Sequence, residues 1–317
     1  MPEGILVTGA SGFVGGQLIT RLAAQPSALV RGAVRAKLEG DHSVLITVGE
    51  INADTDWAEA LQGQRVIVHA AARAHIMDDG AVDPLAEFRE VNVAGTLNLA
   101  RQAAAAAVRR FIFISSIKVN GEQSPPGGCF KADDLPAPED PYAISKWEAE
   151  QGLQRIALET GMEVVIIRPP LVYGPGVKGN FASMARIIAK RLPLPLGAVH
   201  NKRSLVALDN LIDLIVTCIH HPSAANQVFL AGDGEDLSTC ELLRRVGEAM
   251  GRKARLLPLP VALLQLGLSV IGKGAIAQRL VGSLQVDISK TRDVLDWKPP
   301  ISVDEGLRRC FSNSQDG

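Results

Sequence analysis

The sequence predicts an α/β protein with a doubly wound parallel sheet and a smaller, mainly C-terminal second lobe. Short apolar runs alternate with helical stretches through the first half of the chain, which is the pattern of successive βαβ units. Runs such as residues 111–114 and 164–167 are apolar at every position, as strands covered on both faces are. The alternation stops after residues 168–170, Arg-Pro-Pro, and a chain of 317 residues is long enough for two lobes.

The elements of the first lobe are expected in a fixed order. Strands are predicted at residues 5–7, 29–34, 44–48, 66–69, 111–114 and 164–167, with helices at 18–24, 88–108 and 143–160. After the two prolines, a strand at 204–208, a helix at 212–219 and a strand at 228–231 are expected to return to this lobe. We therefore assign residues 1–170 and about 204–232 to the first lobe, and residues 171–203 and 233–317 to the second.

Composition and charge argue against several classes of function. Apolar residues make up 47% and charged residues 21%, and a net charge of −1 gives no overall field for nucleic acid or an acidic membrane. The four cysteines are widely separated, so we expect no zinc or other metal site. Since the chain opens directly on the first strand, we expect no secretory leader and a cytoplasmic location.

The longest apolar stretch is residues 261–271, which contain a Gln and a Gly. The stretch is too short to cross a bilayer, so no stable membrane insertion is expected. We expect a buried helix of the second lobe and weigh it against a helix that lies on a membrane surface.

A glycine-rich turn follows the first strand and opens a helix. Its glycines, Gly9, Gly12 and Gly15, are three residues apart. Gly9 permits the tight turn, Gly12 lets the backbone approach a pyrophosphate, and Gly15 lets helix and strand pack closely. In this strand–turn–helix context the motif predicts a Rossmann fold that binds a dinucleotide at the helix N-terminus. The other residues of the turn that we expect against the cofactor are Ser11, Phe13 and Val14.

The second strand carries no acidic residue of the kind that binds the adenosine ribose of NAD. Its end reads Arg31-Gly-Ala-Val-Arg35. Either arginine could contact a 2′-phosphate, so the sequence favours NADP over NAD, with Arg35 as the main candidate. The alternative is that both arginines stack on adenine or face water.

A tyrosine and a lysine form the candidate catalytic pair. Tyr142 and Lys146 are four residues apart at the start of a predicted helix, which places them on one helical face. An ammonium beside a phenol favours the phenolate and is expected to lower its pKa. Such a phenol can exchange a proton with an alcohol oxygen while a hydride moves to or from a nicotinamide. Ser115 and Ser116 follow the preceding strand and complete the candidate site.

Taken together, these motifs resemble the extended short-chain dehydrogenase/reductase family, which includes NAD-dependent nucleotide-sugar epimerases, dehydratases and 4-keto-sugar reductases. The matching segments occur in the family's order and cover the whole first lobe. They are residues 8–15, His69-Ala-Ala-Ala72, Asn92-Val-Ala-Gly-Thr96, Ser115-Ser116, Tyr142-x-x-x-Lys146 and residues 168–175, Arg-Pro-Pro-Leu-Val-Tyr-Gly-Pro.

The resemblance implies a role for each matching residue. Ser116 would hydrogen-bond the C4 oxygen of a sugar, Tyr142 would be the acid/base, and Lys146 would hold the nicotinamide ribose. Asn92 would support the active-site helix. The remaining positions that the resemblance places against the cofactor are Glu50, Ile51, Ala70, Ala71, Ala72, Pro169 and Leu171.

The resemblance extends to a UDP-sugar substrate and to the assembly. Asn180 lies where the family holds the nucleotide, and Arg203 would bind the diphosphate, since a guanidinium suits that anion. Arg279 is a second candidate for this role. The family often dimerises through two long helices, here residues 88–108 and 143–160, so a homodimer is expected.

Departures from the family pattern decide between reactions. Ile117 and Lys118 occupy the places of the dehydratase acids, so dehydration is not expected. Residues 118–121, Lys-Val-Asn-Gly, together with Arg35, favour a 4-keto-sugar reductase of the N-acetylhexosamine type, acting in polysaccharide precursor synthesis. The alternative is a UDP-hexose or UDP-N-acetylhexosamine 4-epimerase with bound NAD. A lipid-linked sugar as substrate and a non-catalytic dinucleotide-sensing protein are more distant alternatives.

Overall fold

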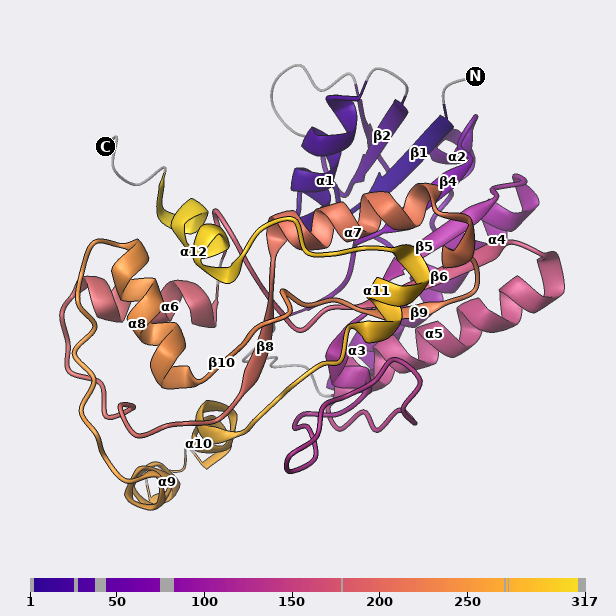
Figure 1. The fold of residues 1–317 in the computed structure, drawn as a ribbon. Helices are drawn as coiled ribbons and strands as arrows, with labels where there is room; N and C mark the ends of the chain where they lie inside the picture. The colour runs from indigo at the N-terminus through magenta and orange to yellow at the C-terminus, as the bar shows by residue number, and fades with distance from the viewer. Residues whose placement is uncertain are drawn as a thin grey trace.

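The computed structural model describes residues 3–25, 28–37, 44–74, 83–177, 179–270, 272 and 274–312 (Figure 1). For residues 180, 268, 275–277 and 279 it describes the backbone alone. Two lobes are visible, a large one around the indigo and magenta strands and a smaller one at the left that includes α6, α8, α9 and α12.

The large lobe is built on a seven-stranded sheet in the order β3-β2-β1-β4-β5-β6-β9, and every neighbouring pair is parallel. The chain fills one half of this sheet first and then returns to the other side of β1, which confirms the predicted doubly wound Rossmann sheet. The strands are β1 (Glu3–Thr8), β2 (Ala28–Val34), β3 (Leu45–Thr47), β4 (Val66–His69), β5 (Arg110–Ile114), β6 (Glu163–Arg168) and β9 (Val228–Leu230).

Alternate side chains of each strand enter two separate cores. In β5, Ile112 and Ile114 join the core beneath α1 (Phe13–Ala23) and α7 (Leu208–His220). Phe111 and Phe113 join the core beneath α4 (Thr96–Ala105) and α5 (Pro141–Thr160). Both faces of the sheet are therefore covered, which is why the strands are apolar at consecutive positions.

The helix expected at 88–108 is interrupted. The structure has α3 (Pro84–Arg89), a π-helix η1 (Glu90–Gly95) and then α4. Gly95 lies so close to Ile51 that a Cβ on the glycine would be 2.6 Å from Ile51 Cγ2. A π-helical turn adds a residue and reorients the side chains around it, and such turns are frequent at functional sites. The smaller elements of this lobe are α2 (Ala58–Leu61), η2 (Ile117–Val119) and η3 (Pro222–Ala224).

The small lobe contains a three-stranded sheet in the order β10-β8-β7. Its strands are β7 (Leu171–Tyr173), β8 (Arg203–Ala207) and β10 (Asp236–Leu237), and its helices are α6 (Asn180–Ala189), α8 (Thr239–Ala249), α9 (Val261–Val270), α10 (Gly274–Val281) and α12 (Val303–Ser312). Residues 204–208 do not join the seven-stranded sheet, because β8 pairs with β7 and β10. Val206 and Leu208 are nevertheless buried in the core beneath α7, so the segment contacts both lobes.

One helix beyond the expected boundary at residue 233 packs against the large lobe. Helix α11 (Ser289–Leu295) belongs to the large lobe, since Leu295 and Trp297 are buried in the core beneath α7. Trp297 Nε1 donates to Asp213 Oδ2 on α7 at 2.9 Å, and Thr291 Oγ1 donates to the carbonyl of Leu230 at 2.8 Å. Helix α12 then rejoins the small lobe, where Leu307 is buried, so the C-terminal segment crosses between the lobes twice.

Helix α9 departs from its prediction in burial. The sequence favours a buried helix for residues 261–271, yet Leu263, Leu266 and Val270 are exposed. Leu264 is buried and holds the helix on the small lobe. Among the residues that the structure describes, no helix is long and apolar enough to cross a membrane.

Candidate functional site

The candidate site lies along the edge of the sheet where the parallel strands end. In parallel sheets ligands bind at this edge, at the point where the strand order reverses. Here that point lies between β1 and β4, which end at Thr8 and His69. The turn after β1 and the segment after β4 therefore meet at the position expected for a dinucleotide.

The three glycines of the turn each meet a backbone or an open surface. Gly9 has a φ of +66°, and a Cβ on it would lie 2.8 Å from the backbone nitrogen of Ala71. A Cβ on Gly15 would lie 2.2 Å from the carbonyl oxygen of Gly9. Gly12 is exposed at the N-terminus of α1. Side chains at Gly9 and Gly15 would therefore force the turn and the helix away from β4.

The start of α1 fits an anionic group such as a dinucleotide pyrophosphate. The N-cap of the helix is Gly12, which has no side chain to accept from the first backbone N–H groups, and no acidic residue lies in the first turn. These N–H groups, at Phe13, Val14 and Gly15, stay available at the positive end of the helix. Ser11 is exposed beside them, and the predicted residues Ala70, Ala71 and Ala72 follow directly after β4.

A buried histidine joins the three elements beneath this turn. His69 Nδ1 lies 2.7 Å from Thr8 Oγ1, and His69 Nε2 lies 2.9 Å from Thr96 Oγ1. Thr8 Oγ1 in turn accepts from the backbone nitrogen of Ala71 at 3.3 Å. Burial, with the charge of Lys146, lowers the pKa of His69 to about 3. The imidazole is therefore neutral, and it positions the cofactor turn as a hydrogen-bonding group.

The two arginines of β2 have different surroundings. Arg35 is exposed just beyond the strand end, and its Nε lies 3.6 Å from Glu50 Oε1. Arg31 Nη1 donates to the carbonyls of Glu59 and Ala60, at 2.7 and 3.2 Å, and so caps the end of α2. A cofactor role for Arg31 is therefore wrong, while Arg35 and Glu50 lie side by side where an adenosine ribose is expected.

The two serines after β5 point in opposite directions. Ser115 is buried and donates from Oγ to Glu150 Oε1. Ser116 is half-buried and extended, and its Oγ accepts from the backbone nitrogen of Lys118 at 3.3 Å, which caps η2. The backbone nitrogen of Ile117 donates to the carbonyl of Pro169, which joins η2 to the end of β6. This arrangement leaves Ser116, rather than Ser115, available to a ligand.

Lys146 reaches the same strand end from α5. Its Nζ donates to the carbonyl of Ile114 at 2.8 Å and lies 4.3 Å from the centre of the Phe113 ring. Burial lowers the pKa of Lys146 to about 7, and the carboxylate of Glu150 acts in the opposite direction. The ammonium therefore lies at the last residue of β5, two residues before Ser116 in the chain, where it could bind a ligand held by Ser116.

Tyr142 is half-buried at the first turn of α5, with its ring against Phe88. Burial raises the pKa of the Tyr142 phenol above its ordinary value, and the Asp140 carboxylate adds to this. The expectation that Lys146 lowers this pKa is wrong for the protein alone. A burial penalty on the phenolate outweighs a lysine whose ammonium is directed at a backbone carbonyl.

Asn92 connects the π-helix to the catalytic helix. It is buried, and its Nδ2 donates to Ser145 Oγ at 3.0 Å. Ser145 Oγ donates to the carbonyl of Tyr142 at 2.7 Å. Asn92 also accepts from the backbone nitrogen of Arg73 at 2.9 Å, in the segment after β4. The side chain therefore supports α5 just where Tyr142 begins it, as the resemblance implies, and does not touch the turn at Gly9.

A buried ion pair behind the site was missed by sequence reasoning. Arg168 Nη2 and Nε donate to Glu150 at 2.6 and 3.0 Å, and Arg168 Nη1 donates to Asn120 Oδ1 at 3.0 Å. Together with Ser115 these groups tie β5, η2, α5 and β6 together. A possible signal in the sequence is the glutamate four residues after Lys146 on the same helical face.

A second charged cluster lies at the rim, and it too was missed. Lys118 Nζ donates to Glu122 Oε1 at 2.7 Å and to Asp140. Asp140 caps α5 by accepting from the backbone nitrogen of Ala143 at 2.7 Å. Lys118 therefore connects the loop after Ser116 to the helix end that carries Tyr142.

The predicted substrate residues lie in the small lobe. Arg203 begins β8, and its Nη1 donates to the carbonyl of Gly282 at 3.2 Å. Asn180 begins α6 and Arg279 lies in α10, but the side chains of both fall outside the described part of the structure. Leu171 is exposed at the start of β7, between the lobes.

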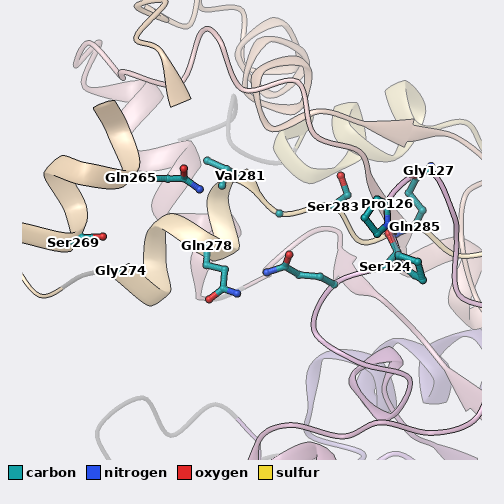
Figure 2. Close-up of a pocket in the computed structure, with 13 residues that line it drawn as sticks. Ser124, Pro126, Gly127, Gln265, Ser269, Gly274, Gln278, Val281, Ser283 and Gln285 are labelled. Atoms are coloured by element: carbon teal, nitrogen blue, oxygen red, sulfur yellow. Dashed lines mark hydrogen bonds between the residues drawn. The ribbon is translucent and has the colours of Figure 1, made fainter. Parts of the chain in front are cut away.

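A cavity of about 640 Å³ lies between α9, α10 and the loop that continues from Ser116 (Figure 2). Its polar lining is uncharged and comprises Gln123, Ser124, Gln265, Ser269, Gln278, Ser283 and Gln285. None of Ser116, Tyr142 and Lys146 lines it. In the described parts of the chain, no group of three or more His, Cys, Asp or Glu side chains could hold a metal ion.

Comparison with known proteins places this site in a family. The model of the NAD dependent epimerase/dehydratase family matches residues 5–232. A Vibrio cholerae protein named UDP-glucose 4-epimerase is 52% identical over 98% of this chain and 94% of its own. A Pseudomonas aeruginosa GDP-6-deoxy-D-mannose reductase is 26% identical over 99% of this chain and 97% of its own.

The fold is shared with solved structures. A UDP-glucuronic acid 4-epimerase from Bacillus cereus, in complex with NAD, superposes with a TM-score of 0.79 at 23% identity. The superposition covers 98% of this chain and 97% of the other.

Proposed function

The chain belongs to the NAD-dependent epimerase/dehydratase family and is an NAD(P)-dependent enzyme of nucleotide-sugar chemistry, and we propose that it interconverts the C4 epimers of a UDP-hexose or UDP-N-acetylhexosamine with retained NAD. The observation that carries this proposal is the 52% identity, over nearly the whole chain, with the V. cholerae protein named UDP-glucose 4-epimerase. Against the non-catalytic alternative, Lys146 reaches the strand end that precedes Ser116, and Tyr142 lies one helical turn before Lys146 on α5.

The geometry suits proton and hydride exchange at one carbon of a sugar. Ser116 Oγ holds the C4 oxygen, and the Tyr142 hydroxyl takes the proton of that oxygen and later returns it. Lys146 would hold the ribose of the cofactor, and the bound nicotinamide would supply hydride transfer at C4. The pyrophosphate is held by the backbone at the start of α1. Epimerisation further requires the 4-keto sugar to turn over before the hydride returns to its other face.

The sequence analysis favours a 4-keto-sugar reductase, and the comparisons support the epimerase better. The reductase relative is 26% identical, half the figure of the epimerase relative. The reductase inference rested on Arg35 and on the segment from Lys118 to Gly121. Arg35 is paired with Glu50 at the surface and Lys118 with Asp140 and Glu122, so both have partners within the protein.

The proposal is tested with the purified chain and UDP-galactose, without added cofactor. We expect proton NMR to show UDP-glucose forming until both epimers reach equilibrium, with no net change in nicotinamide absorbance. UDP-N-acetylgalactosamine is tested in parallel. If neither sugar is converted while a UDP-4-keto sugar consumes NADPH one for one, the reductase assignment replaces the epimerase.

Replacing Arg35 by Asp is expected to weaken the binding of NADPH relative to NADH by about tenfold or more, because a carboxylate there repels a 2′-phosphate. The measurement is the ratio of dissociation constants for NADPH and NADH. Arg31→Ala is the matched control, since that arginine caps α2, and its ratio should stay that of the parent. An unchanged ratio in Arg35→Asp removes this residue from cofactor selection.

We also propose a cytoplasmic homodimer assembled through α4 and α5. These two helices lie side by side and cover one face of the sheet with Leu99, Ala103 and Leu153. Their outer surface includes Leu158, which is 90% exposed. Sedimentation should give twice the mass of the chain, and Leu158→Glu should shift it towards the monomer.

A further inference from the structure

Helix α9 directs apolar side chains outwards. Leu263, Leu266 and Val270 are 54%, 62% and 78% exposed. They are three and four residues apart, so they lie on one face of the helix. In Figure 1, α9 lies at the far end of the small lobe, outside α10 and away from the main sheet. We call these three side chains the α9 face.

The buried side of the same helix is formed by Leu264, and the polar side chains Gln265 and Ser269 are exposed. Gln265 and Ser269 line the cavity between α9, α10 and the loop after Ser116, as Figure 2 shows. A helix at the surface of a soluble domain ordinarily has one apolar stripe, which faces inwards. Helix α9 has the inward Leu264 and, in addition, the exposed α9 face. Helix α9 therefore exposes an apolar stripe to water, which is unfavourable.

Two segments of the small lobe, one of which leads into α9, carry exposed basic residues. Arg252, Lys253 and Arg255 precede the helix and are all exposed, as are Lys190 and Arg191 after α6. The two segments are joined by hydrogen bonds. The backbone nitrogen of Leu194 donates to the carbonyl of Arg255 at 2.8 Å, and Arg252 Nη1 donates to the carbonyl of Ala189 at 2.6 Å.

Two more exposed leucines lie within these basic segments. Leu192 is 50% exposed and Leu257 is 53% exposed. The two joined segments therefore expose both basic and apolar side chains. This mixture differs from an ordinary solvated surface, where exposed leucines are single and scattered.

Basic residues are also concentrated in two segments of the sequence. Residues 169–208 contain six basic residues and no acidic one, and residues 251–286 contain five basic residues and no acidic one. The whole chain nevertheless has a net charge of −1. The positive charge is thus concentrated in the segments that form α6, α9, α10 and their connections, and the negative charge lies elsewhere.

We propose that the α9 face rests on the surface of a bilayer that contains anionic phospholipid. Exposed apolar side chains at helical spacing, in a lobe whose segments 169–208 and 251–286 carry only basic charges, match the two layers of such a surface, the acyl chains and the negative headgroups. A second copy of this chain fits less well, because a symmetric contact would bring the same basic residues together. The contact is peripheral, with the helix lying in the plane of the surface.

The proposal is tested by flotation of the full chain with large unilamellar vesicles. We expect binding to vesicles of phosphatidylcholine and phosphatidylglycerol, little binding to phosphatidylcholine alone, and loss of binding at high salt. Leu266→Ser should weaken binding about tenfold, since it removes an apolar side chain from the contact. Leu29→Ser is the matched control, because Leu29 on β2 is also 62% exposed, and it should bind as the parent does.

Two results would overturn the proposal. One is equal binding of the parent and Leu266→Ser to anionic vesicles, and the other is no binding of the parent at all. Sedimentation of both proteins without lipid tests the alternative that a second copy of the chain covers this face. A smaller mass for Leu266→Ser than for the parent would show that it does. Turnover of a UDP-sugar in solution should be the same in both proteins, so failure here leaves the proposed reaction unaffected.

Discussion

Replacing Tyr142 by Phe is expected to lower the turnover of a UDP-sugar by roughly 10²–10⁴-fold, the usual contribution of a positioned acid/base. The phenol is half-buried at the first turn of α5, and its pKa is raised by burial and by Asp140. The protein alone therefore keeps the proton on Tyr142. A positive charge bound nearby would favour the phenolate, so proton exchange should depend on occupied cofactor and substrate sites.

The measurement is the rate of epimer formation by NMR at saturating substrate, together with the amount of retained nicotinamide. Phe keeps the ring against Phe88, so cofactor content and thermal stability should match the parent. Tyr173→Phe is the control, since Tyr173 is the other tyrosine of the chain and its hydroxyl donates to Asp233 Oδ2 at 2.7 Å in the small lobe. That variant should lose stability and keep its rate. Unchanged turnover in Tyr142→Phe would contradict the acid/base assignment.

The strands of the large lobe were predictable because burial on both faces demands consecutive apolar residues. Residues 66–69 and 111–114 are both found in the central sheet as expected. The path of residues 204–208 was not predictable in this way, since an apolar strand fits either sheet. What decides it is the pairing of β7 with β8, a long-range contact that no local pattern encodes.

Other features depend on orientation, which residue type alone does not reveal. Residues 261–271 are apolar enough for a buried helix, yet α9 turns its leucines outwards. Arg31 on β2 and Arg35 just beyond its end have the same chemistry, and only the position of α2 shows that Arg31 is a helix cap. The choice of Ser116 over Ser115 came from the family resemblance alone, and the hydrogen bond of Ser115 to the carboxylate of Glu150 gives a physical reason for it.

The buried pair of Glu150 and Arg168 was not predictable from the sequence either. The two charged residues are 18 positions apart in the chain, and only the fold shows that both are buried. Their side chains are 0% and 3% exposed. Such a pair has lost its hydration, so removing one partner leaves an uncompensated charge in the core. The pair also holds Ser115 and Asn120, on either side of Ser116 and η2.

We therefore expect Arg168→Met to lower the free energy of unfolding by about 3–5 kcal/mol. The double variant Glu150→Leu/Arg168→Met should recover much of this loss, since two apolar side chains leave no buried charge, although Ser115 and Asn120 lose their partners. Urea unfolding followed by circular dichroism measures all three proteins. Glu148→Gln is the control on the same helix, because Glu148 pairs with Arg89 at the surface and should contribute less than about 1 kcal/mol.

The dependence of activity on pH shows whether Glu150 acts on Lys146 or only stabilises the fold. Glu150 opposes the burial that lowers the pKa of Lys146, so the double variant should lower that pKa further even where its stability is recovered. Lys146 would then lose its proton at lower pH, and the alkaline limb of the activity profile should move to lower pH. A double variant with recovered stability and an unshifted profile would mean that Glu150 holds the fold together without acting on Lys146.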